Sequence, residues 1–165
     1  MTWRTGIGMP ATILGVGLGG FVDGIMLHQV LQWHHMLSST GSDRIGVREY
    51  PTDTVPGLEM NTLWDGFFHV FTWLAVLTGL ALLYSRLSHP RSGVWRSRAL
   101  WGWLAVGWGL FNLVEGLIDH QILGIHHVRA GAHQAWWDLG FLLLGAALVG
   151  GGLLLARDSR VRTAP

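Results

Sequence analysis

Two stretches of the chain place acidic and histidine residues at the same spacing. The stretch GFVDGIMLHQVLQWHH covers residues 20–35, and NLVEGLIDHQILGIHH covers residues 112–127. Each contains an acidic residue, a glycine, a His-Gln pair after three further residues, and a His-His pair near its end. Imidazole and carboxylate groups in this density are typical of metal sites, haem sites and proton-transfer sites. The recurrence predicts that both halves of the chain contribute to one chemistry.

On an α-helix with about 100° per residue, the acidic and histidine side chains fall on two stripes. His28 and His35 share a stripe with Gly24, whereas Asp23 and His34 lie on a second stripe about 120° around the helix. The second stretch repeats the first stripe with Gly116, His120 and His127, and the second with Glu115, Asp119 and His126. So wide a polar arc predicts helices that face protein or water rather than lipid.

Two further apolar stretches each carry a Trp-Asp pair near their beginning. In LWDGFFH, Asp65 and His69 are four residues apart and share a helical face with Asn61 and Thr72. In WWDLGF, Asp138 occupies the corresponding place. Polar groups from all four apolar stretches are therefore expected at a similar depth.

We expect these residues to bind a transition metal. The expected ligands are His28, His35, Asp65, His69, His120 and His127, with His34, His126, His133 and Asp138 as alternates. The expected orienting or proton-handling groups are Asp23, Glu115 and Asp119. The chain has no cysteine, which excludes thiolate ligands, disulfides and covalently attached c-type haem. For any single histidine, an interfacial position or a neutral, hydrogen-bonded imidazole is the simpler interpretation.

Several functions compete for this set of residues. Imidazole-rich sites without thiolate suit copper, iron or zinc, and we favour copper, then iron, because imidazoles outnumber carboxylates. A redox-active ion would make the protein a metal-dependent oxidoreductase or electron carrier. A b-type haem between His28 and His120, with Gly24 and Gly116 leaving room for the porphyrin, is the first alternative. A transporter or proton relay, and a scaffold subunit of a larger membrane complex, are the others.

The elements that position these residues are membrane helices. Half of the 165 residues are apolar and only 13% are charged, and a span needs about 20 mostly apolar residues. Residues 10–35, 61–86, 97–125 and 133–156 meet that length. We predict an all-α integral membrane four-helix bundle, a single domain over 1–165. Two parallel two-helix repeats, at about 10–86 and 97–156, would have the same membrane orientation because each crosses twice.

Arginine placement predicts the orientation of the bundle. All eleven basic residues are arginine, with eight expected on the side of the termini and three on the other, which favours both termini in the cytoplasm and the histidines in the extracytoplasmic half. The first helix is expected to be retained, since no small-residue cleavage site follows it. The net charge of +1 gives no reason to expect nucleic acid. Expected partners are lipid, a second copy or a larger membrane complex. The loop 36–60 is expected to be a lid or a partner surface.

The motifs GFVDGIMLHQVLQWHHML, LWDGFFH and GLFNLVEGLIDHQILGIHHVR resemble those of a bacterial family of predicted membrane proteins, domain of unknown function 2243. The resemblance covers nearly the whole chain. It implies a four-span protein of the bacterial inner membrane, and it implies no reaction. The metal site is an inference from the residues themselves.

Overall fold

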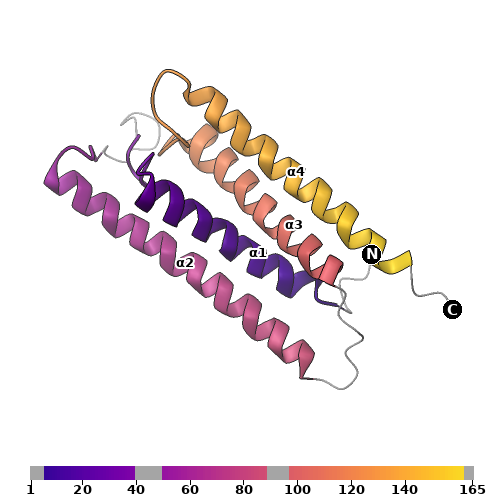
Figure 1. Cartoon of the computed structure of the whole chain (residues 1–165). Helices are drawn as coiled ribbons and strands as arrows, with labels where there is room; N and C mark the ends of the chain where they lie inside the picture. Colours follow the sequence, from indigo (N-terminus) through magenta and orange to yellow (C-terminus); the bar gives the residue numbers. More distant parts are fainter. Residues whose placement is uncertain (1–5, 40–49, 89–96, 162–165) are drawn as a thin grey trace.

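The computed structural model describes residues 6–39, 50–88 and 97–161, and these ranges are helical with connecting loops (Figure 1). Helix α1 (Gly8–Val22) continues into a π-helical segment, η1 (Asp23–Val30). Helix α2 (Val55–Leu87) follows. Helix α3 (Ser97–Glu115) likewise continues into a π-helical segment, η2 (Gly116–Leu123), and α4 (Gln134–Val161) completes the described chain. These elements confirm the predicted all-α fold with four helices.

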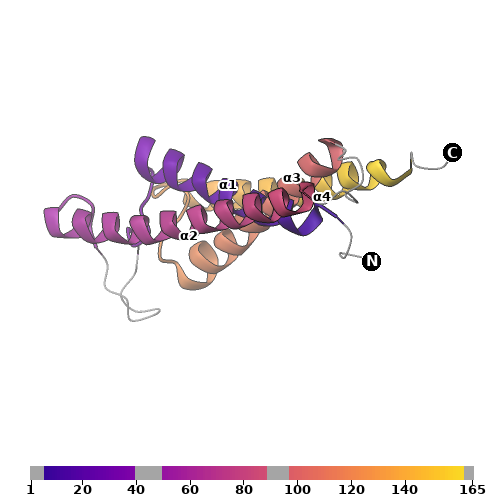
Figure 2. The ribbon, with the colours of Figure 1, turned by 90° about the horizontal axis from the view of Figure 1, so that it is seen from below.

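The helices pack in the order α2, α1, α3, α4. Within the described ranges α1 contacts α2 and α3, and α3 contacts α4, whereas α2 and α4 lie on opposite outer sides (Figure 1). Figure 2 shows that α1 and α3 cross and diverge toward the end where they become η1 and η2. The start of α1 and the end of α4 lie at the other end of the molecule. The two histidine-bearing loops therefore meet at one end, between the diverging helices.

Glycines allow α1 and α3 to approach closely where they cross. A Cβ added at Gly15 would overlap the carbonyl oxygen of Leu104, and one added at Gly107 would overlap the carbonyl oxygen of Thr12. Small residues at such contacts are how helices pack in lipid, where apolar association between helices is weak. The crossing point is consequently set by backbone contact, which determines how far apart η1 and η2 lie.

Three of the helices are long and apolar enough to cross a membrane. They are Gly8–Val30, Val55–Arg86 and Gln134–Arg157. Large apolar side chains are exposed along α2 and α4, among them Phe71 and Leu143, as expected for surfaces that face lipid. The predicted fourth crossing, α3 with η2, is less apolar because it carries Asn112, Glu115 and His120, which are buried inside the protein. The polar side chains of this crossing therefore face the other helices and not lipid.

The helix ends differ from the predicted ones in ways that matter for the site. The first helical stretch ends at Val30 and the third at Leu123, so both His-His pairs lie in loops. Helix α2 begins at Val55, earlier than predicted, because the Thr54 hydroxyl caps it by accepting a hydrogen bond from Gly57 N at 3.3 Å. The predicted loop 36–60 is therefore shorter, and residues 40–49 of it lie outside the described ranges.

Several arginines used for the orientation argument also lie outside the described ranges. They are Arg4, Arg44, Arg48, Arg91, Arg96 and Arg162. The orientation from arginine placement accordingly stays a prediction.

Candidate metal centre

The π-helical segments place an acidic residue and a histidine on the same face. In a π-helix each N–H bonds to the carbonyl five residues earlier, so residues five positions apart lie nearly above one another. Asp23 and His28 are five apart in η1, as are Glu115 and His120 across the start of η2. On an α-helix, five residues correspond to about 500°, which is one full turn plus about 140°, so the same two side chains would point in different directions. The π-helical winding therefore places both acidic residues on the same face as the histidines.

Four imidazoles converge between η1 and η2. The rings of His34 and His126, from the two loops, stack in the middle with centroids 4.7 Å apart and planes 3° from parallel. His28 lies 4.4 Å from His34 on one side, and His120 lies 4.9 Å from His126 on the other. All four side chains are buried. Residues separated by about ninety positions thus form a single cluster.

Each loop histidine is held by the backbone of the opposite half. His34 Nδ1 lies 2.9 Å from the carbonyl oxygen of Val128, and His126 Nδ1 lies 3.4 Å from that of Met36. The loops also bond to each other through Ser39 N and the carbonyl of Ile125, at 3.0 Å. Because a carbonyl only accepts, Nδ1 of both imidazoles is the donor. In the neutral ring, Nε2 then carries the lone pair and faces the cluster.

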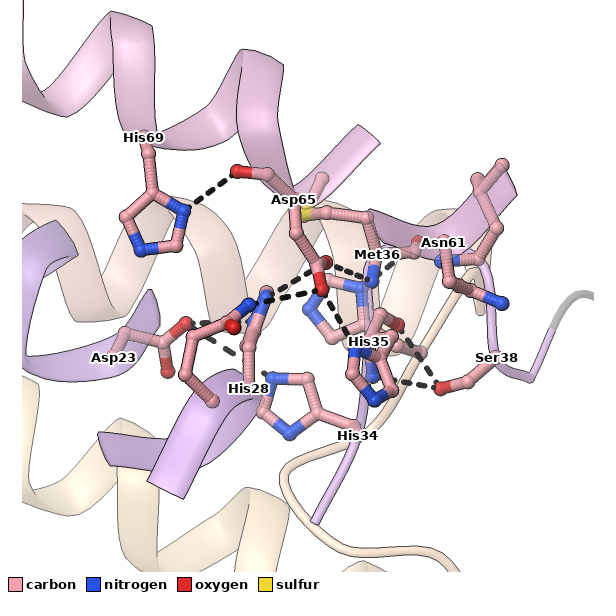
Figure 3. Close-up of polar contacts among 12 residues, drawn as sticks. Asp23, His28, His34, His35, Met36, Ser38, Asn61, Asp65 and His69 are labelled. Atoms are coloured by element: carbon pink, nitrogen blue, oxygen red, sulfur yellow. Dashed lines mark hydrogen bonds and ion pairs between the residues drawn. The ribbon is translucent and has the colours of Figure 1, made fainter. Parts of the chain in front are cut away.

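Asp65 on α2 orients the first half of the site (Figure 3). Its carboxylate accepts hydrogen bonds from His28 Nδ1 at 2.9 Å, His35 Nδ1 at 2.6 Å and Met36 N at 3.0 Å. Nearby, the Asn61 side chain accepts from Leu37 N at 2.9 Å. Asp65 thus holds the loop over the end of the bundle and directs His28 Nε2 inward.

Asp138 on α4 makes the corresponding contacts in the second half. It accepts from His127 Nδ1 at 2.7 Å and from Val128 N at 3.0 Å. His120 Nδ1 lies 3.5 Å from Asp138 Oδ1, the oxygen that accepts from Val128 N, and this distance is too long for a good hydrogen bond. The outer carboxylates are therefore similar in arrangement, and the one in the first half binds its inner histidine more tightly.

The inward-facing atoms of the cluster are left without hydrogen-bond partners. They include both carboxylate oxygens of Asp23 and of Glu115, and Nε2 of His28, His34, His120 and His126. His28 Nε2 lies 3.1 Å and His34 Nε2 lies 3.9 Å from Asp23 Oδ2, and His126 Nε2 lies 3.5 Å from Glu115 Oε1. Buried groups of this kind normally have partners, because leaving them unpaired is costly. A cation or a shared proton between such facing acceptor atoms would give them a partner.

One set within the cluster has the spacing of ligands around a single ion. His28, His34, Glu115 and His126 each offer one atom, and these atoms all lie within 4.8 Å of one another. Two ligands about 2.0 Å from a tetrahedral ion are about 3.3 Å apart. The cluster would therefore need to contract slightly to bind an ion.

The two loop imidazoles are in the protonation state that a metal requires. Burial lowers the pKa of His34 to about 4, outweighing the nearby carboxylate of Asp23. Burial also lowers the pKa of His126 well below its usual value, with the neighbouring imidazoles acting in the same direction. Both rings are thus neutral at pH 7, and metals bind the neutral imidazole.

The structure separates the expected ligands into two layers. His28, His120, His34 and His126 lie in the inner cluster, together with the expected orienting groups Asp23 and Glu115. The outer layer holds His35 and His127, which donate to Asp65 and Asp138. Direct coordination by these four outer residues stays a prediction.

Three of the remaining candidates lie away from the inner atoms. His69 Nδ1 donates a hydrogen bond of 2.7 Å to the carbonyl oxygen of Asp65 in its own helix, and Figure 3 shows this contact. His133 is exposed at the start of α4, and Asp119 is half-buried on η2. The space beside Gly24 and Gly116 is filled: an added Cβ would lie 2.8 Å from His69 Nε2 and 2.8 Å from Leu142 Cδ2, respectively. These glycines serve helix packing.

Sequence reasoning did not find the inward position of Asp23 and Glu115. The 100° rule placed them on a different stripe from His28 and His120, because it assumes an α-helix. The one available signal was the repeated five-residue interval between acid and histidine, which suits an i, i+5 winding.

A cation–π contact joins the loop after η1 to the loop after η2 and to α4. The Arg129 guanidinium lies 5.1 Å from the ring centre of Trp33 and 5.7 Å from that of Trp137, and the two indoles are 5.1 Å apart. Such cation–π contacts stabilise by about 0.5–2 kcal/mol, according to how far they are desolvated. The contact joins the loop after η1 to the start of α4.

The fold and the cluster define a helical membrane protein with buried histidine and carboxylate groups between its central helices. The chain belongs to a family of predicted membrane proteins, DUF2243, whose model matches residues 10–159. This confirms the resemblance seen in the motifs. No curated protein and no solved structure matches the chain.

Proposed function

We propose that this membrane protein binds a transition-metal ion in the inner cluster, with copper favoured and iron next. The observation that carries the proposal is the group of buried, unpaired Nε2 and carboxylate atoms that face one another. The ligands are His28, His34 and His126 with Glu115, and Asp23 lies beside them. Asp65 and Asp138 orient the imidazoles from outside, as carboxylates commonly do for metal-binding histidines.

The charges around the cluster favour a metal over a purely structural network. Asp23, Asp65, Glu115 and Asp138 are all buried, and no arginine is buried in the described part of the chain. Buried carboxylates are normally paired with cations or metal ions, since dehydrating an unpaired charge is costly. A divalent ion supplies that charge where the inward atoms meet.

The composition of the ligand set supports copper, iron or zinc. Four imidazoles and two carboxylates face the centre, and the chain has no thiolate to offer. Imidazole is a ligand for copper, iron and zinc alike, and the excess of imidazole keeps copper first. Oxidoreductase or electron-transfer activity would follow from a redox-active ion.

Two observations weigh against a b-type haem between His28 and His120. The rings of His34 and His126 lie between these two histidines. The glycines that were expected to leave room for a porphyrin are packed against α2 and α4. A non-haem ion does not require a porphyrin-sized space, so neither observation weighs against it.

We also propose that the two halves are structural repeats in the bacterial inner membrane, with both termini in the cytoplasm. The shared element order and the matched contacts of Asp65 and Asp138 support the repeat. The placement of the start of α1 and the end of α4 at the end opposite the cluster, together with the arginine pattern, supports a metal site in the extracytoplasmic half.

The test is metal analysis of the protein purified in mild detergent. We expect bound copper or iron without the intense Soret band of haem, and loss of metal from His34→Gln. His133→Gln, which alters an exposed histidine, is the matched control and should keep its metal. Protein that is folded by circular dichroism yet takes up no copper, iron or zinc would overturn the proposal. A Soret band at one haem per chain would instead establish the alternative.

A further inference from the structure

His120, beside His126, and Asp23, beside His28, carry further buried atoms that no hydrogen bond satisfies. Neither ring nitrogen of His120 has a hydrogen-bond partner, and neither carboxylate oxygen of Asp23 has one. The side chains are 2% and 3% exposed, respectively, so bulk solvent does not reach them. A single ion held by His28, His34, His126 and Glu115 leaves these further atoms unexplained.

The cluster is arranged about an approximate two-fold axis that passes between His34 and His126. The ring centroids of His28 and His126 are 6.0 Å apart, and those of His34 and His120 are 6.3 Å apart. The nearest pairs within each half also match, at 4.4 and 4.9 Å. Whatever His28 and His34 bind on one side of the axis, His126 and His120 can therefore bind on the other.

Each half supplies its own carboxylate. Asp23 Oδ2 lies 3.1 Å from His28 Nε2 in the first half, and Glu115 Oε1 lies 3.5 Å from His126 Nε2 in the second. A carboxylate has two oxygens, so each acid could contact both sides. Two imidazoles and two shared carboxylates would give each side four ligands, a common number for transition metals in proteins.

Two divalent ions would balance the buried charge if all four carboxylates are ionised and every imidazole is neutral. Four buried carboxylates, two inside the cluster and two holding it from outside, carry four negative charges when ionised. With every imidazole neutral, one divalent ion compensates half of that charge and two compensate all of it. Buried charge without compensation is strongly unfavourable in a membrane interior.

We propose that the centre is dinuclear, with one transition-metal ion bound by His28 and His34, a second bound by His120 and His126, and the carboxylates of Asp23 and Glu115 shared between them. This inference rests on the proposed metal-binding function, adds a second ion and assigns His126 to that ion in place of the first. Two-metal sites in proteins have ions about 3.5–4 Å apart, which suits two ions bridged by carboxylates.

The experiment is a metal count per chain on the full-length protein in detergent, after loading with Cu(II) and removal of excess. We expect two copper ions in the wild-type protein and one in both His28→Gln and His120→Gln. His133→Gln, the exposed control, should keep two. One ion in the wild-type protein, lost in His28→Gln and kept in His120→Gln, would overturn the dinuclear centre and leave the proposed function standing. No bound ion in folded wild-type protein would overturn both.

Electron paramagnetic resonance gives a second readout that does not depend on the variants folding. Two Cu(II) ions bridged at about 4 Å couple magnetically, so the spin count of the wild-type protein should fall well below its copper content. A spin count equal to the copper content in wild-type protein that holds two ions would place them apart and overturn the shared centre.

Discussion

Replacing Asp65 by alanine removes the carboxylate that orients the first half of the site. The substitution leaves three close donors without their acceptor, His28 Nδ1, His35 Nδ1 and Met36 N at 2.9, 2.6 and 3.0 Å, and one longer donor, Gln29 Nε2 at 3.5 Å. Hydrogen bonds to a charged group contribute about 1.5–3 kcal/mol each. Because Asp65 is 1% exposed, water can satisfy the donors only by entering the cavity. Three such bonds contribute about 4.5–9 kcal/mol, and water that enters the cavity offsets part of their loss, so we expect Asp65→Ala to lower the free energy of unfolding by about 4 kcal/mol.

The same substitution should weaken metal binding without touching an inner ligand. Loss of an outer partner typically lowers metal affinity about 10- to 100-fold, or about 1.4–2.7 kcal/mol. Freed from Asp65, His28 can protonate Nε2 instead of Nδ1 and then has no lone pair toward the centre. Asp65→Asn keeps one acceptor oxygen, so the metal affinity of this variant should fall less than the metal affinity of Asp65→Ala.

Competition with a chromophoric chelator measures the metal affinity, and circular dichroism with gel filtration checks that each variant is folded. Asp138→Ala is the matched comparison, because its contact with His120 is longer, at 3.5 Å. We expect a smaller loss of affinity from it than from Asp65→Ala. A folded Asp65→Ala protein with wild-type metal affinity would show that the outer carboxylate does not orient a ligand.

Three further predictions concern the loops around the site. Gln32 has a left-handed backbone conformation, with φ of 49°, and Gly124 has the corresponding position in the second half, with φ of 62°. Because this conformation strains residues other than glycine, Gln32→Gly should raise the unfolding free energy by up to about 1 kcal/mol and Gly124→Gln should lower it by about as much. Equal losses of stability in both variants would contradict backbone strain at Gln32. Arg129→Ala should lower the unfolding free energy by about 0.5–2 kcal/mol and change the tryptophan fluorescence, because the guanidinium lies over the Trp33 and Trp137 rings. An unchanged fluorescence spectrum would argue against this contact. Metal-free protein should lose stability as the pH falls from about 6.5 toward 4, because the unfolded chain protonates His34 near 6.5 and the folded chain only near 4. Denaturation at a series of pH values measures this loss, and stability that is constant or rises on acidification across that range would contradict it.

Much of the architecture follows from the sequence alone. Apolar stretches of sufficient length predicted four helices, and periodicity placed Asn61, Asp65 and Thr72 on one face of α2, where all three are buried. The duplicated acid and histidine pattern predicted that both halves contribute to a shared cluster. These features depend on hydrophobicity and local helical geometry, which residue order determines directly.

The division between inner and outer groups was decided by the tertiary structure. The π winding of η1 and η2 turns Asp23 and Glu115 inward. The helices end before the His-His pairs, and the loops then cross so that each half supplies a carbonyl to the other. Asp65 and Asp138 are used to hold these loops. The physical reason is that hydrogen-bond partners from distant segments exist only after α1 and α3 have packed, and those partners select both the helix winding and the nitrogen that each imidazole presents.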